Sequence, residues 1–223
     1  MSSDDAHPLE VLSFEPAHQL MDSLVVGNQR GLAVEYLKNY FETEPYTGRW
    51  FDRLDDGGDR PEVAGRITAS DLVALSLLGV AIRRGDVVID LLYRRAAELS
   101  ERLEVIPTDV AMHEVPWASF GPGSAADEAY WLLRQCRGVG RTVANKLLAR
   151  KRPQLLPVYD EQVHHLLGQP PSAWSLLWSW FHICQVRDEG LAAFDEEVAG
   201  IKDISLLRRL DVVLWMAATS GGH

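Results

Sequence analysis

The chain has 223 residues, a formal net charge of −10 and a hydrophobic content of 47%. This composition excludes a disordered chain, because enough apolar residues are present to bury a core, and it excludes a protein that binds polyanions over its whole surface, because that affinity needs an excess of Lys and Arg. Only Cys136 and Cys184 are present, which excludes a disulfide framework, a cysteine-bound zinc ion and an iron–sulfur cluster.

The start of the chain predicts neither a signal peptide nor a membrane anchor. The first residues, MSSDDAHPLE, are acidic where a signal peptide is basic, and the longest apolar run, LVALSLLGVAI, is too short to span a bilayer. We therefore expect a cytoplasmic protein with no membrane partner. No feature of the sequence predicts an oligomeric state.

Residues 1–27 are predicted to form a polar N-terminal stretch, followed by a helical lobe over residues 28–123. Apolar residues at helical spacing predict helices in NQRGLAVEYLKNYF and GDVVIDLLYRRAAELSERL, and Thr68 and Asp71 predict a capping box that opens a third helix in ITASDLVALSLLGVAIRR. The segment EPYTGRWFDRLDDGGDRPEVAGR is rich in Gly, Asp and Pro, which predicts a long loop, and PTDVAMHEVPWASFGPGS, with three prolines, marks the boundary between two lobes.

Residues 124–223 are predicted to form a second helical lobe. The expected fold class is all-α, with a bundle over about residues 124–217 packed closely against an N-terminal helical portion over about residues 28–105. Capping and periodicity predict six helices in the second lobe, at residues 124–136, 141–151, 160–168, 171–185, 188–199 and 205–217.

The distribution of charge singles out one part of this lobe. Residues 129–159, here called the basic segment, contain seven Lys or Arg and no Asp or Glu, so that the rest of the chain has a charge of −17. One interpretation is a focused contact with an anion on an otherwise acidic protein. The other is a helix face whose counter-charges lie elsewhere in the fold.

The basic segment contains a turn with two glycines between two predicted helices. Gly138 and Gly140 permit positive φ angles and a close approach of another backbone, and Val139 between them can fill the core. The helix that follows begins with free N–H groups, which suit a phosphate. The alternative is a turn that only packs two helices together.

The sequence RGVGRTVAN, followed by VYDEQV, resembles the helix-hairpin-helix DNA glycosylases of the endonuclease III and adenine glycosylase type over about residues 130–168. The flanking segments YTGRWFDRL, ITASDLVALSLLGV and LRRLDVVLWM look closer to an uncharacterised bacterial branch of that fold. The resemblance implies double-stranded DNA as partner, a hairpin that binds its backbone, a monovalent cation held by carbonyls of the turn, and a catalytic carboxylate at Asp160. The residues implied in backbone binding are Gly138, Val139, Gly140, Arg141, Thr142 and Lys146.

The chain departs from this family at several positions. Thr142 stands where bifunctional members have a lysine, so Schiff-base strand cleavage is not expected and a monofunctional N-glycosylase is. The cysteines of the iron–sulfur cluster are absent, Glu161 and Gln162 replace Thr-His after the aspartate, and Arg137 replaces a proline before the first glycine.

Other interpretations of the candidate residues remain open. Asp160 is also a good N-cap for the helix that follows it. Tyr46, Arg49 and Trp50 form a possible base pocket, or they pack in the core. His164 and His165, one turn after Asp160, are more typical of a core or a surface than of a site. The alternative to a glycosylase is a non-enzymatic module that uses the same fold to bind DNA or a protein.

Overall fold

The computed structural model describes residues 14–43, 46–183 and 187–220, and all secondary structure in these ranges is helical. The predicted all-α class is thereby confirmed for the described part of the chain. The principal helices are α2 (Glu15–Val25), α3 (Arg30–Glu42), α4 (Ala69–Leu77), α5 (Gly85–Ile89), α6 (Ala96–Val105), α7 (Ala125–Gln135), α8 (Arg141–Lys151), α9 (Glu161–Leu166), α10 (Ala173–Ile183), α11 (Arg187–Glu197) and α12 (Leu206–Ser220).

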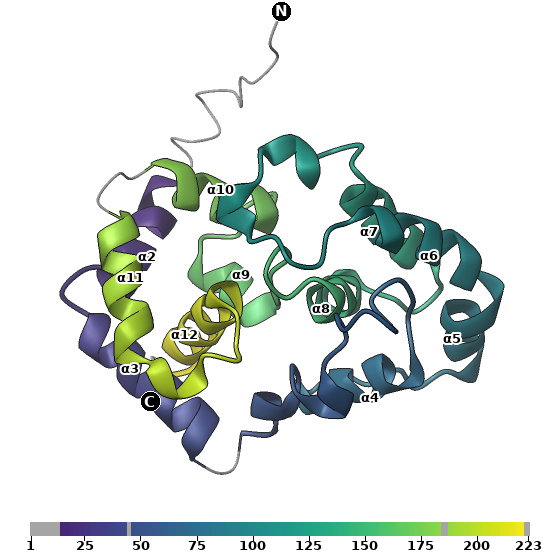
Figure 1. The fold of residues 1–223 in the computed structure, drawn as a ribbon, viewed down its shortest axis with the longest axis horizontal. Helices are drawn as coiled ribbons and strands as arrows, with labels where there is room; N and C mark the ends of the chain where they lie inside the picture. Colours follow the sequence, from purple (N-terminus) through teal and green to yellow (C-terminus); the bar gives the residue numbers. More distant parts are fainter. Residues whose placement is uncertain (1–13, 44–45, 184–186, 221–223) are drawn as a thin grey trace, which may run out of the picture.

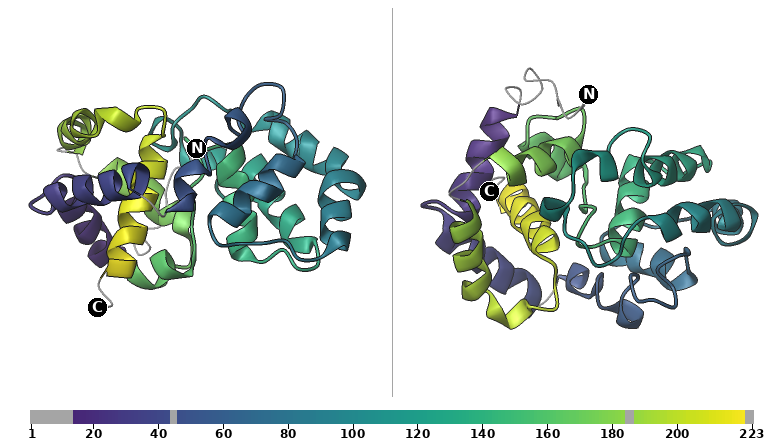
Figure 2. Two further views of the ribbon diagram at one scale, coloured as in Figure 1. Left: turned by 90° about the horizontal axis from the view of Figure 1, so that it is seen from below. Right: turned by 45° about the horizontal axis from the view of Figure 1, so that its top comes forward.

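The helices form two groups that lie side by side (Figures 1 and 2). In one group α8 packs against α4 and α7, and α7 packs against α6; in the other α12 packs against α3 and α9, and α2 and α11 pack against α3. Contacts therefore cross the boundary predicted between residues 123 and 124. The second group is discontinuous in sequence, because helices from both ends of the chain share one core.

Helix α2 lies inside the stretch predicted to be polar, residues 1–27, and corrects that prediction. Its buried residues are spaced one helical turn apart, at Ala17, His18, Met21, Leu24 and Val25. Polar residues between them lower the average hydrophobicity of the segment, so the apolar face of the helix is difficult to recognise from the sequence. The helix is also bound to α10, since the indole N–H of Trp180 donates to Asp22 at 2.8 Å. Residues 1–13 of the predicted stretch lie outside the described residues.

Local capping signals place several of the other helices. The predicted capping box is present: Thr68 Oγ1 accepts from the Asp71 N–H at 3.3 Å, and Asp71 Oδ2 accepts from the Thr68 N–H at 2.7 Å. The helix predicted over residues 85–103 is instead divided into α5, a π-helical turn η3 (Asp90–Arg94) and α6. Among the described residues no helix has the length and apolarity needed to cross a membrane.

Candidate functional site

The helix–turn–helix unit predicted from the two glycines is present between α7 and α8. Gly138 adopts a φ of +95°, a left-handed conformation that favours glycine, and Val139 is only 3% exposed, so it fills the core as expected. Gly140, the N-cap of α8, has no side chain that could accept from the first-turn N–H groups, so these groups are available to an anion. The carbonyl of Val139 accepts a hydrogen bond from the Arg134 guanidinium at 3.1 Å. That guanidinium competes with the monovalent cation expected at the turn carbonyls.

Four of the seven basic residues are buried, which corrects the picture of a basic surface. Lys146, Arg150, Lys151 and Arg152 are at most 3% exposed. The contact of Lys146 with a DNA phosphate stays a prediction; the structure places its ammonium inside the protein, on the wall of a cavity. Arg134 and Arg137 on the hairpin are exposed and Arg141 is half-buried, so these three residues are the part of the basic segment that solvent reaches.

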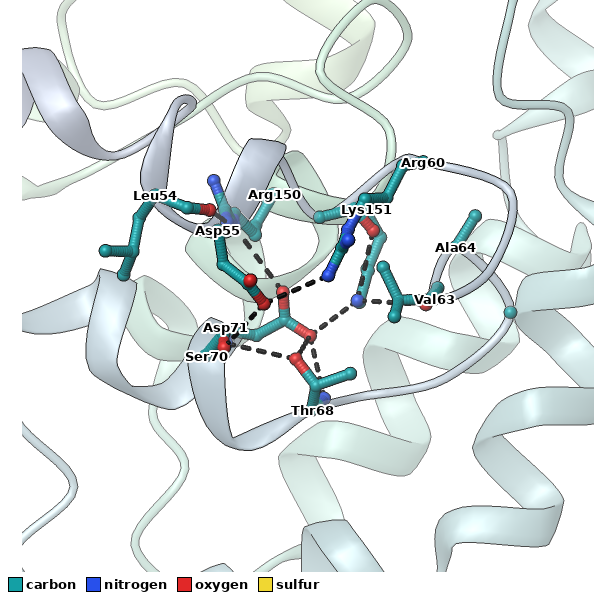
Figure 3. Close-up of polar contacts among 12 residues, drawn as sticks. Leu54, Asp55, Arg60, Val63, Ala64, Thr68, Ser70, Asp71, Arg150 and Lys151 are labelled. Atoms are coloured by element: carbon teal, nitrogen blue, oxygen red, sulfur yellow. Dashed lines mark hydrogen bonds and ion pairs between the residues drawn. The ribbon is translucent and has the colours of Figure 1, made fainter.

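Arg150 and Lys151, at the end of α8, hold the irregular segment before α4 (Figure 3). Arg150 donates to the carbonyls of Phe51 and Leu54. Lys151 donates to the carbonyls of Gly58 and Val63, each at 3.1 Å.

Lys151 also forms an ion pair with Asp71, with Nζ 2.5 Å from Oδ2. Arg152 donates to the carbonyls of Ala64, at 3.0 Å, and Ile106, at 2.7 Å. These cations serve the fold, because they satisfy carbonyls that no regular secondary structure pairs.

The two carboxylate oxygens of Asp160 have different partners. Oδ1 accepts from the N–H groups of Gln162, at 3.1 Å, and Val163, at 3.3 Å, and so caps α9. Oδ2 lies 3.6 Å from Nζ of Lys146. Asp160 also lines a cavity of about 270 Å³, here called the Asp160 cavity, together with Lys146. The structure thus contains the helix cap and the open space beside the carboxylate at once.

The Asp160 cavity lies where the two groups of helices meet. Its walls come from α3, the turn η1 (Thr47–Trp50), the end of α4, α8, the start of α9, and α12. Burial lowers the pKa of Lys146, and the nearby Asp160 partly restores it. The Lys146 ammonium also donates to the carbonyl of Leu78 at 3.3 Å. This geometry holds a cation beside the carboxylate at the edge of an apolar space.

Two charged residues of the cavity were not predicted from the sequence. Asp211 on α12 is 3% exposed, and its Oδ2 accepts from the Val158 N–H at 2.7 Å. Burial raises the pKa of Asp211 well above its usual value. Arg208, one turn earlier, donates to Asp52 at 2.9 Å and to the Tyr40 hydroxyl at 3.2 Å. The sequence feature that could have indicated these two residues is an arginine and an aspartate at i, i+3 inside the apolar run LRRLDVVLWM.

The predicted base pocket is only partly assembled. Tyr46 lines the Asp160 cavity and stacks on Tyr40, with ring centroids 5.4 Å apart. Arg49 and Trp50 do not line it; the Arg49 guanidinium lies 5.6 Å from the Trp50 ring, which is 51% exposed. His164 also lies outside the cavity, with Nδ1 3.1 Å from the Tyr159 hydroxyl. Within the described ranges no group of three or more His, Cys, Asp or Glu is placed to hold a metal ion.

The fold and the cavity define an all-α protein with a buried Lys–Asp pair between two groups of helices. The chain belongs to a family whose description is "Family of unknown function (DUF6308)", which matches residues 33–218. The match begins within α3 and ends within α12, and it includes every residue that lines the Asp160 cavity. No curated protein and no solved structure matches the chain.

Proposed function

We propose that the protein binds double-stranded DNA and removes a base as a monofunctional N-glycosylase. The observation that supports this proposal most is the position of Asp160, which lines a cavity at the start of α9 while Lys146 lies beside it on the helix of the hairpin. The hairpin would bind the DNA backbone through the N–H groups at the start of α8, assisted by Arg137 and Arg141. A flipped nucleotide would then enter the cavity.

The residues of the cavity suit the steps of N-glycosidic hydrolysis. The bond between C1′ and the base breaks with its electron pair on the base, and the Asp160 carboxylate stabilises the positive sugar. A water then adds to C1′, and Asp160 accepts its proton. Asp211, whose pKa is raised, can supply the proton that the leaving base requires. Lys146 orients Asp160 through the ion pair.

The size of the cavity is consistent with a small group. Its volume of about 270 Å³ lies just below the range of roughly 300–1,000 Å³ typical of sites for drug-sized ligands. Tyr40, Tyr46 and Trp215 supply aromatic walls. Such walls favour a single planar base or one sugar over a longer chain.

The proposal is tested with duplexes that contain a panel of damaged or mismatched bases. Wild-type protein should excise at least one of them, and Asp160→Asn should lower the rate by about 10²–10³-fold while keeping the helix cap and the affinity for DNA. Glu161→Gln is the matched control, because its carboxylate is adjacent in sequence but lies outside the cavity. Equal loss in both variants would contradict a specific role of Asp160.

One observation favours a second candidate, a non-enzymatic module that binds DNA or a protein. Arg141 is paired with Glu161 at 2.9 Å, and four of the basic residues are buried, so little positive charge remains for a phosphate. In that case wild-type protein would bind a partner but excise no base from any duplex of the panel.

A further inference from the structure

A second pocket of about 270 Å³ opens on another face of α8 and is here called the Asn145 pocket. Residues that are neighbours in the sequence line the two sites. Lys146 and Asp160 line the cavity, whereas Asn145 and Tyr159 line the pocket. Successive residues of a helix point about 100° apart, so one helix can present different side chains to two sites.

The amide of Asn145 is the central polar group of this pocket. Asn145 is 6% exposed as a residue, but no atom of its amide is among the fully buried side-chain atoms without a partner, so the amide is accessible from the pocket. An amide that water reaches through a pocket can exchange that water for the polar groups of a ligand. Because Asn145 lines an open pocket, a ligand with its own donor and acceptor has room to bind there.

The aromatic residues around the pocket supply a surface for a planar ring. Trp131 is 56% exposed. Tyr130 meets it edge to face, with ring centroids 5.3 Å apart, and meets Trp174 in the same way at 5.9 Å. All three rings line the pocket. An exposed indole that is held by other rings is a good platform for stacking.

We propose that the Asn145 pocket binds one unpaired nucleobase, which stacks on Trp131 and forms hydrogen bonds with the Asn145 amide. An amide presents a donor and an acceptor side by side, which matches the N6 amino group and N7 of adenine. Arg141 lines the same pocket and begins α8, so a phosphate next to the base would meet a cation and free N–H groups. This inference rests on the proposed binding of DNA, but it assigns a site separate from the Asp160 cavity.

A nucleobase fits this pocket better than a peptide does. Proline-rich peptides also bind to aromatic grooves, but they have no anionic group for Arg141 and the start of α8. Asp127, the acidic residue of the pocket, already accepts a hydrogen bond from the Gly123 N–H at 2.9 Å.

The test compares two short single strands of equal length and charge, one of deoxyadenosine and one without bases. Wild-type protein should bind the deoxyadenosine strand more tightly in fluorescence anisotropy. Trp131→Ala should weaken that binding by about 5- to 150-fold, equivalent to about 1–3 kcal/mol, and leave binding of the abasic strand unchanged. Tyr93→Ala is the matched control, because this ring is 71% exposed and lies outside the pocket.

A second variant tests the hydrogen bonds separately from the stacking. Asn145→Leu keeps the volume of the side chain and should remove the preference for a deoxyadenosine strand over a thymidine strand. Circular dichroism establishes that both variants are folded, and Trp131→Ala tests the pocket without changing a buried residue.

The other outcomes show which of the two proposals, the Asn145 pocket or the glycosylase, is supported or overturned. Equal affinity of wild-type protein and Trp131→Ala for the deoxyadenosine strand would overturn the site, even if the protein excises bases. Failure to bind any single strand would overturn the site, whereas the glycosylase is tested independently by excision from duplexes. Loss of affinity in Trp131→Ala without any excision by wild-type protein would support the site and reject the glycosylase. Binding of a proline-rich peptide in place of the strands would assign the pocket to a protein partner.

Discussion

Asp71 provides a direct test of the role that the structure gives to the buried basic residues. Its carboxylate is 1% exposed, accepts hydrogen bonds from Thr68 and lies 2.5 Å from Nζ of Lys151. Burial lowers the pKa of Lys151, and Asp71 acts in the opposite direction. Asp71→Asn retains the volume of the side chain but leaves the Lys151 ammonium buried without a counter-charge.

The expected loss of stability is large. Removing one partner of a buried ion pair costs about 3–5 kcal/mol, compared with a total free energy of unfolding of about 5–15 kcal/mol for a typical domain. For a chain of this size, about 2–4 °C of Tm corresponds to 1 kcal/mol, so Tm should fall by roughly 6–20 °C.

The measurement is urea denaturation followed by circular dichroism, with Asp55→Asn as the matched control. Asp55 lies in the same irregular region and pairs with Arg60 at 3.0 Å, but its side chain is 50% exposed. A surface pair of this kind contributes about 0–1 kcal/mol. Equal unfolding midpoints for the two variants would refute the role assigned to Asp71 and Lys151.

Three other residues give predictions about DNA binding, stability and chemistry. Arg137→Glu, on the exposed part of the hairpin, should reduce the slope of log K against log salt for duplex DNA by about 1 or more, whereas an unchanged slope would place the contact elsewhere. Because burial raises the pKa of Asp211 above its usual 3.8, the stability it contributes is present below that value and lost as the pH rises through the folded pKa. In urea titrations, the free energy of unfolding of Asp211→Asn should therefore differ less between about pH 5 and about pH 8 than that of the wild-type protein does. An equal difference in both proteins would contradict this. Excision should leave intact abasic sites and no borohydride-trapped adduct, because the Lys146 ammonium is held by Leu78 and Asp160; an adduct that disappears in Lys146→Met would assign strand cleavage to Lys146.

The parts of the fold that the sequence predicts well are those specified by neighbouring residues. The turn around Gly138 and the capping box of Thr68 and Asp71 are encoded within a few positions. Helices α7 and α8 begin and end within a residue of the prediction, because apolar spacing and caps act over the same short range.

The grouping of the helices and the burial of the basic segment depend on contacts between residues far apart in the sequence. Lys and Arg are rarely fully buried, so composition favours a surface for Arg150 and Lys151. Their partners are carbonyls of residues 51–63, more than 85 positions away, and backbone carbonyls have no sequence signature. The packing of α3 against α12 cannot be predicted from local sequence patterns either, since it joins the two ends of the chain.

The two interpretations of Asp160 that the sequence leaves open turn out to need the same geometry. Accepting the N–H groups of Gln162 and Val163 fixes Oδ1 at the start of α9, and this restricts the direction of Oδ2. That second oxygen lies beside Lys146, on the wall of the cavity. The cap therefore does not compete with a role in the cavity. It holds the carboxylate in position before a ligand binds, which is the preorganisation that electrostatic stabilisation of a developing charge requires.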